Sequence, residues 1–206
     1  MNEDDQGGRG VGKRRGRPSV AERLESGDLS LDGATELARE SVLRTLTAAP
    51  RSRAELARAL ARKGFPEHVV EPVLDRFEEV ALVDDAAYAD MIVRTRHAER
   101  GQARRAISME LRRRGIDTET AGEALSQIDG DDEAEAAAVL ARKHVARTRG
   151  LDRDKRVRRA VGALSRKGHS PGVAFAAVTE ALRAEGEDEG SGDGFPSTTT
   201  EAAADR

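Results

Sequence analysis

The sequence lacks several residue types that large cores and common functional sites require. Among its 206 residues there is no cysteine and no tryptophan, and aromatic residues make up only 2%. The lack of cysteine excludes a disulfide framework, a thiolate nucleophile and cysteine-ligated zinc. Because aromatic side chains dominate the energetics of cores, such a chain suits thin helical modules better than one deep core. It also has no long apolar run, so we expect no membrane span, and its start does not have the pattern of a secretory signal.

Charge, in contrast, is abundant and unevenly placed. Charged residues make up 35% of the chain, with a net charge of −3, and residues 185–206 hold seven acidic side chains and one basic. Residues 34–184 carry 28 basic and 24 acidic side chains, with eight arginines in 94–115 and eleven basic residues in 142–167. Runs of this kind are usually solvated helix faces, but two in corresponding places favour a polyanionic partner.

A short pattern occurs three times at nearly equal spacing. The segments LARKG, LRRRG and LSRKG end at Gly64, Gly115 and Gly168, which lie 51 and 53 residues apart. Basic residues followed by glycine are typical of a helix end, where the glycine adopts a left-handed conformation. An apolar stripe with helical spacing follows each glycine, and other stripes precede it. The pattern therefore predicts one supersecondary unit used three times.

This repeat predicts an all-α protein made of three tandem three-helix repeats. The expected ranges are 34–81, 82–130 and 131–184, with nine helices in total. Because each triplet is small, neighbouring triplets should stack into an elongated, curved body. Residues 1–33, a basic and glycine-rich tail, and the acidic tail 185–206 are expected to be disordered, since they contain too little apolar surface to offset the entropy of ordering.

No group of side chains has the pattern of a catalytic, cofactor or metal site. The four histidines, at 68, 97, 144 and 169, show no paired spacing, so we interpret them as surface or half-buried residues. The acidic pairs 84–85 and 131–132 begin predicted helices, where carboxylates cap the chain. Residues 7–13 resemble a phosphate-binding loop, but Arg14 follows where the motif needs serine or threonine. We therefore predict no enzyme, no cofactor and no metal.

Ten basic residues of the second and third repeats are the candidates for contact with an anionic partner: Arg94, Arg96, Arg104, Arg105, Arg112, Arg113, Lys155, Arg156, Arg159 and Arg166. The guanidinium group suits phosphate and carboxylate alike, so nucleic acid and an acidic protein surface both stay open as partners. The scarcity of aromatic residues argues against base stacking. Residues 14–18, RRGRP, resemble a minor-groove arm, although a basic disordered tail explains them as well.

The centre of the chain contains a longer pattern. It begins with Val83-Asp84-Asp85-Ala86-Ala87-Tyr88-Ala89, continues through Arg94, Arg96 and Ile107, and ends with Glu110-Leu111-Arg112-Arg113-Arg114-Gly115-Ile116. In order and spacing this pattern resembles the central signature of the RecX family, bacterial regulators of the RecA recombinase. The resemblance extends over about residues 34–184. Its structural signature residues are Asp84, Asp85, Tyr88 and the three repeat glycines.

The resemblance implies a cytoplasmic, non-enzymatic regulator of DNA repair, recombination and the SOS response. Members of the family lodge in the groove of the filament that RecA forms on single-stranded DNA, inhibit its ATPase and strand exchange, and promote its disassembly or block its growth. By this resemblance the partners are RecA, its filament and DNA itself, and we expect a monomer. Two alternatives remain: a stand-alone helical DNA-binding or chromosome-organising protein, and a scaffold for an acidic partner that binds no nucleic acid.

Overall fold

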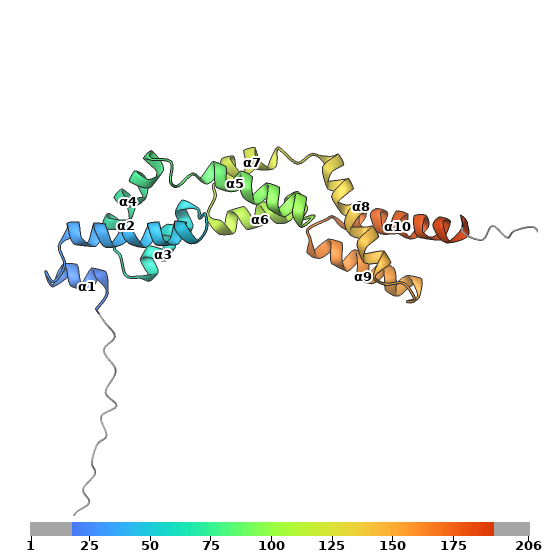
Figure 1. The fold of residues 1–206 in the computed structure, drawn as a ribbon, viewed down its shortest axis with the longest axis horizontal. Coiled ribbons are helices and arrows are strands. Elements are labelled where there is room, and N and C mark those ends of the chain that lie inside the picture. The colour runs from blue at the N-terminus through green and yellow to red at the C-terminus, as the bar shows by residue number, and fades with distance from the viewer. Residues whose placement is uncertain (1–17, 192–206) are drawn as a thin grey trace, which may run out of the picture. The chain divides into compact units, whose positions relative to one another are not determined.

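The computed structural model describes residues 18–191, which fold into ten α-helices and one π-helical segment without any β-strand (Figure 1). The predicted all-α class is confirmed. The helices belong to two compact units, which divide after Asp85. The phosphate-loop-like residues 7–13, and residues 14–17 of the arm-like segment, lie outside the described residues, as does most of each predicted tail.

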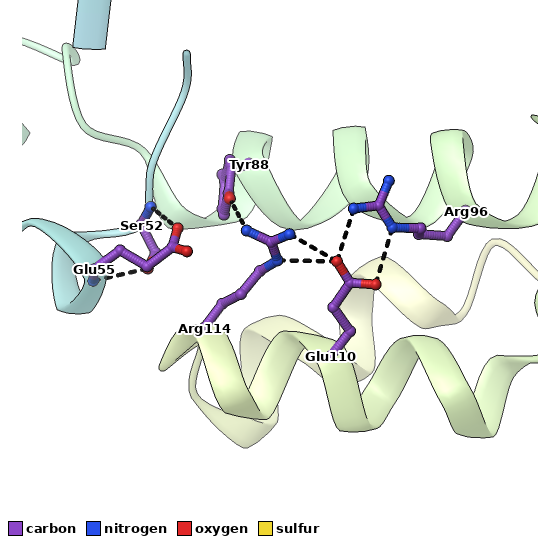
Figure 2. Close-up of polar contacts among 6 residues, drawn as sticks. All are labelled: Ser52, Glu55, Tyr88, Arg96, Glu110 and Arg114. Atoms are coloured by element: carbon purple, nitrogen blue, oxygen red, sulfur yellow. Dashed lines mark hydrogen bonds and ion pairs between the residues drawn. The ribbon is translucent and has the colours of Figure 1, made fainter. Parts of the chain in front are cut away.

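The first unit contains four helices: α1 (Val20–Glu25), α2 (Leu31–Ala48), α3 (Arg53–Arg62) and α4 (Glu67–Glu79). Helices α2, α3 and α4 pack against one another around a core that includes Leu56, Leu60 and Leu74. The buried Ser52 begins α3: its hydroxyl accepts the backbone N–H of Glu55 at 3.2 Å, and the Glu55 carboxylate accepts the N–H of Ser52 at 3.2 Å (Figure 2). This reciprocal capping box satisfies two donors that the helix leaves open.

Helix α1 corrects the prediction that residues 1–33 are disordered throughout. Ser19 caps it, and its apolar side chains pack against the core of the first unit, together with Leu29. The backbone N–H of Ala21 donates to the carbonyl of Gly64 at 2.9 Å. A helix of six residues is unstable alone. Its order therefore comes from tertiary contacts, which composition does not reveal. Helix α2 likewise begins at Leu31, inside the predicted tail.

The second unit contains the remaining helices: α5 (Asp85–Arg94), whose first residue still belongs to the first unit, the π-helical segment η1 (Thr95–Glu99), α6 (Arg104–Arg114), α7 (Thr118–Leu125), α8 (Gly130–Ala146), α9 (Arg153–Arg166) and α10 (Pro171–Ser191). One core cluster joins α5, α6 and α7, and another joins α8, α9 and α10. Together with the core of the first unit there are three clusters of buried residues. The buried residues of each cluster come from one predicted repeat range, except that Val83, from the second range, packs in the core of the first unit.

A close backbone contact joins the two clusters of the second unit. The N–H of Ala103, just before α6, donates to the carbonyl of Lys167 at 2.9 Å, and the ring Nε2 of His169 lies 3.0 Å from the carbonyl oxygen of Gly101. His169 is buried, which differs from the surface or half-buried position expected of it. A Cβ atom at Gly168 would lie 2.6 Å from the Cβ of Ala106, so only glycine fits this contact.

Helix α10 corrects the other end of the predicted fold, because it continues to Ser191 rather than ending at residue 184. Its Glu185, nearly buried, accepts hydrogen bonds from the guanidinium groups of Arg149 and Arg156. Glu185 lies one turn beyond the buried Ala181, so the continuing helix brings the carboxylate to these two arginines. The sequence analysis did not predict this contact, because the acidic composition of residues 185–206 indicated a disordered tail.

Candidate functional site

The signature residues of the second repeat form an ionic network between α5, η1 and α6 (Figure 2). The carboxylate of Glu110 accepts two hydrogen bonds from Arg96, at 2.8 and 2.9 Å, and two from Arg114, at 2.7 and 3.1 Å. Arg114 also donates to the hydroxyl of the buried Tyr88 at 2.6 Å, and its guanidinium carbon lies 5.6 Å from the centre of the tyrosine ring. The network therefore ties α6 to the preceding helical segment.

The charges of this network are strongly coupled. Hydrogen bonds from Arg96, and secondarily from Arg114, lower the pKa of Glu110 to about 2, against the opposing effect of burial. The same pairing raises the pKa of Arg96 above its ordinary value. Replacing Glu110 would leave two facing guanidinium groups uncompensated, which costs several kcal/mol, about 3 to 5. These residues hold the fold together, and both guanidinium groups face Glu110.

The other signature residues also have structural positions. Asp85 accepts the backbone N–H of Arg53, at the start of α3, at 2.9 Å, and Asp84 is exposed immediately before α5. Gly64, Gly115 and Gly168 all have positive φ, at 81°, 88° and 94°. This left-handed conformation is what the predicted helix ends require, because glycine adopts it without the steric cost that a Cβ brings.

The structure divides the ten candidate cations into two groups. Arg96 pairs with Glu110, and Arg156 pairs with Glu185 and donates to the carbonyl of Val145 at 3.0 Å. The side chain of Arg96 is 14% exposed and that of Arg156 is 16% exposed. We therefore remove Arg96 and Arg156 from the candidate contacts, because their guanidinium groups are used inside the protein. The other eight candidates are exposed.

Three of these eight lie together in a hollow of about 540 Å³ beside α6, which we call the α6 hollow. Its polar lining consists of Arg104, Arg105, Ser108, Arg112, Thr118, Glu133, His169 and Ser170. Glu133 is already engaged, since it accepts the backbone N–H of Arg104 at 2.7 Å. Arg112 donates to the hydroxyl of Ser108 at 3.3 Å, a neutral partner that leaves its charge uncompensated. The hollow thus presents three arginines from one helix.

Three others line a second hollow, of about 710 Å³, along α9, which we call the α9 hollow. Its lining is His144, Thr148, Lys155, Arg158, Arg159, Ala163 and Arg166. The remaining two candidates, Arg94 and Arg113, line neither hollow. Sequence reasoning missed Ser108, Thr118, His144, Thr148 and Arg158 as lining residues. The spacing of His144 and Thr148, one helical turn apart, is the signal that could have placed these two together.

Residues 18–191 show neither a metal site nor a membrane-spanning helix. Within that range no group of three or more histidine or acidic side chains is arranged to hold a metal ion. None of the helices described there combines the length and the apolar character that crossing a membrane demands. The basic hollows are therefore the strongest candidate site in the described part of the chain.

Comparison with known proteins gives consistent matches. The family model described as "RecX, first three-helix domain" matches residues 38–77, and "RecX, second three-helix domain" matches residues 84–125. Regulatory protein RecX of Streptomyces coelicolor is 46% identical over 173 residues, which is 84% of this chain and 92% of the relative. Regulatory protein RecX of Thermobifida fusca is 49% identical over 149 residues, which is 72% of this chain and 80% of the relative.

Solved structures agree with these matches. A crystal structure of a regulatory protein RecX aligns with a TM-score of 0.65 at 27% identity, covering 76% of this chain and 78% of the other. The crystal structure of RecX from Lactobacillus salivarius aligns with a TM-score of 0.62 at 21% identity, covering 73% of this chain and 97% of the other, and bears on the fold alone.

Proposed function

The chain belongs to the RecX family of regulatory proteins, and from this we propose that it is a non-enzymatic regulator of a RecA recombinase. In this proposal the protein acts in the cytoplasm as a monomer. It binds the filament that the recombinase forms on single-stranded DNA, suppresses ATP hydrolysis and strand exchange, and so modulates DNA repair and recombination. It needs no catalytic group of its own, because it acts by occupying a surface of another assembly.

The observation that carries the proposal is the α6 hollow. Arg104, Arg105 and Arg112 line one concavity, and no carboxylate pairs with their guanidinium groups within residues 18–191. Arginines of this kind suit phosphate or carboxylate oxygens on a partner. The Glu110 network holds α6 in place, so the arginines project from a fixed support, which lowers the entropy that binding costs.

The family and the hollow support different parts of the proposal. Family membership supports the choice of recombinase as partner, and the α6 hollow supports contact with an anionic surface. The α6 hollow also contains Leu125 and Val173, so a protein surface can pack there as well as a phosphate. The alternative of a stand-alone DNA-binding protein draws on the arm-like residues 14–18, of which 14–17 lie outside the described residues.

The test is an ATPase assay of a RecA recombinase on single-stranded DNA, with this protein added in increasing amounts. We expect inhibition near stoichiometric amounts, with strand exchange suppressed in parallel. Arg105→Glu and Arg112→Glu should each raise the amount needed for half inhibition about tenfold, since a reversed charge repels the partner. Arg142→Glu, an exposed arginine of α8 that lines neither basic hollow, is the matched control and should change little. No inhibition by the unaltered protein would refute the proposal.

A further inference from the structure

The α9 hollow differs from the α6 hollow in the chemistry of its lining. Every polar side chain around it is a hydrogen-bond donor: His144, Thr148, Lys155, Arg158, Arg159 and Arg166. No carboxylate lines it, and its one apolar lining residue is the small Ala163. A protein partner would find little to pack against here. The tetrahedral oxygens of a phosphate, which accept several hydrogen bonds at once, match such a lining closely.

The cations of α9 converge on one face of the helix. Lys155, Arg159 and Arg166 are spaced four and seven residues apart, which places them in line over three turns. Gly162 lies between Arg159 and Arg166, and a Cβ there would meet only the Arg166 Nη1 atom, at 3.5 Å. The helix surface is therefore open at this point, so a ligand can approach between the two guanidinium groups.

These cations are available to a ligand. Arg159 and Arg166 take part in no ion pair among the described residues, and both are exposed. Lys155 pairs with Asp152 at 2.7 Å, but both side chains are more than half exposed, at 59% and 52%. Surface pairs of this kind contribute at most about 1 kcal/mol and exchange readily for a stronger partner.

His144 adds a titratable donor to the hollow. Its ring is half-buried and accepts or donates no hydrogen bond within the described residues. Burial lowers its pKa, and the charges of Arg147 and Lys143 at the end of α8, and of Arg166 and Lys167 at the end of α9, lower it further. Glu99, Asp132 and Glu135 line a neighbouring hollow that His144 also borders. Without a ligand the His144 ring is thus neutral near pH 7. An anion in the α9 hollow would offset the nearby positive charges and so raise the pKa of the ring.

We propose that the α9 hollow binds a phosphodiester of single-stranded nucleic acid, and that His144 takes up a proton from solvent when the phosphate binds. No covalent bond to phosphorus forms or breaks; the imidazole gains one proton, and the resulting cation donates to a phosphate oxygen. This proposal rests on the proposed function. It adds to that function a binding site for the single-stranded DNA that the recombinase holds. Binding then becomes tighter as pH falls, because the bound state holds one more proton than the free state.

The experiment measures binding of labelled oligothymidylate to the full chain without recombinase, at fixed low salt, from pH 8 to pH 6. The phosphodiesters of this probe keep their charge across that range. The affinity should rise by up to about tenfold per pH unit where the ring titrates. His144→Gln should abolish this dependence, whereas His97→Gln, another half-buried histidine, should preserve it. The His144 ring pKa, followed by NMR, should rise when the probe binds.

Two further arms identify the ligand and the site. The double variant Arg159→Gln/Arg166→Gln should lose about tenfold in affinity, while Arg153→Gln, an exposed cation of α9 outside the hollow, should lose less than about twofold. Polyglutamate of equal charge should compete poorly. A pH dependence that survives in His144→Gln would overturn the proposal, as would an unchanged affinity in the double variant or equally strong competition by polyglutamate. Because no recombinase is present, these outcomes are independent of the ATPase test.

Discussion

Arginine residues that look alike in the sequence serve two different purposes in the second unit. Arg96 and Arg114 surround Glu110, and Arg156 faces Glu185, so these three stabilise the fold. Arg105 and Arg112 instead line an open hollow. Arg114 lies one helical turn from Glu110, which is a local signal, but Glu110 is 14 residues from Arg96 and Glu185 is 29 residues from Arg156. For Arg96 and Arg156, only the packing of helices against one another decides that the arginine meets a carboxylate.

The Glu110 network predicts a pH-dependent contribution to stability. The folded-state pKa of Glu110, about 2, lies below the ordinary value of 4.5 for a glutamate side chain. The contribution is therefore complete above about pH 5 and is lost as pH falls toward 2; it amounts to about 3 kcal/mol at pH 7. Glu110→Gln should lower the free energy of unfolding in urea by about that amount at pH 7, and by about half as much at pH 3.

The matched control is Glu123→Gln, an exposed glutamate of α7. It should change the free energy of unfolding by less than about 0.5 kcal/mol at either pH. If Glu110→Gln were equally mild at pH 7, the network would not have the role in stability that its geometry indicates.

At the scale of helices, the contact between Gly168 and Ala106 joins the two cores of the second unit. Gly150 offers a comparison, because its φ of 83° is also left-handed but no atom lies within 4 Å of the position of its missing Cβ. Gly150→Ala should cost only the strain of that conformation, about 1 kcal/mol. Gly168→Ala should cost at least about 2 kcal/mol more, since the backbone of α6 must also move. Equal losses in thermal or urea unfolding would show that the contact does not constrain the second unit.

Helix α1 occupies a comparable position in the first unit. The backbone carbonyl of Gly64 accepts the N–H of Ala21, and a Cβ at Gly64 would lie 2.7 Å from the Cβ of Ser19. In the second unit the start of α6 contacts the Gly168 turn in the same way. Within the first unit, α1 thus covers the end of α3, as capping elements cover the ends of repeat proteins.

Removal of residues 1–27 should therefore weaken the first unit. The loss of the Ala21 hydrogen bond and of the packing of Val20 and Leu24 should reduce its stability by about 2 to 4 kcal/mol. Hydrogen exchange should report this as faster exchange of the Leu56 and Leu60 amides in α3. The amide of Leu111, in α6, serves as the internal control and should keep its rate. Unchanged exchange in α3 would show that α1 is not part of this core.

Most helices could be predicted from the sequence, and the reasons for the exceptions are physical. Helices α2 to α10 carry apolar stripes, and their ends carry caps and glycines, which are local signals. Helix α1 has a local capping box at Ser19 and Glu22, but it is short and also contacts the distant Gly64. The turn of α10 at Glu185 depends on contacts with the distant pair Arg149 and Arg156. The two hollows could not be predicted either. Each combines side chains from separate helices, although all of their arginines on α6 and α9 except Arg158 were candidates.

At the scale of the whole molecule, charge is distributed unevenly along the chain. Residues 18–85 hold 9 basic and 14 acidic side chains, whereas residues 86–186 hold 20 basic and 15 acidic. The net charge of −3 therefore conceals a basic stretch, residues 86–186, that attracts anions. This distribution supports the placement of polyanion contacts within that stretch, and it makes the binding depend on ionic strength.

The dependence on salt gives a quantitative prediction. For single-stranded DNA, each phosphate that a cation neutralises contributes about −0.7 to the slope of log affinity against log salt. The triple variant Arg104→Gln/Arg105→Gln/Arg112→Gln should make that slope about 2 units shallower if each arginine meets one phosphate. Arg142→Gln should leave the slope unchanged. An unchanged slope in the triple variant, measured by anisotropy titration at several salt concentrations, would place the phosphate contacts elsewhere.

The most direct measurement of the central claim is arginine-selective chemical labelling of the protein, read by mass spectrometry, with and without a recombinase filament on single-stranded DNA. Arg105 and Arg112 should react readily in the free protein and lose reactivity at saturating filament. Arg142 should react equally in both states, and Arg96 and Arg156, which face carboxylates, should react slowly in both. If Arg105 and Arg112 kept full reactivity on a saturated filament, the α6 hollow would not be the surface through which this protein acts.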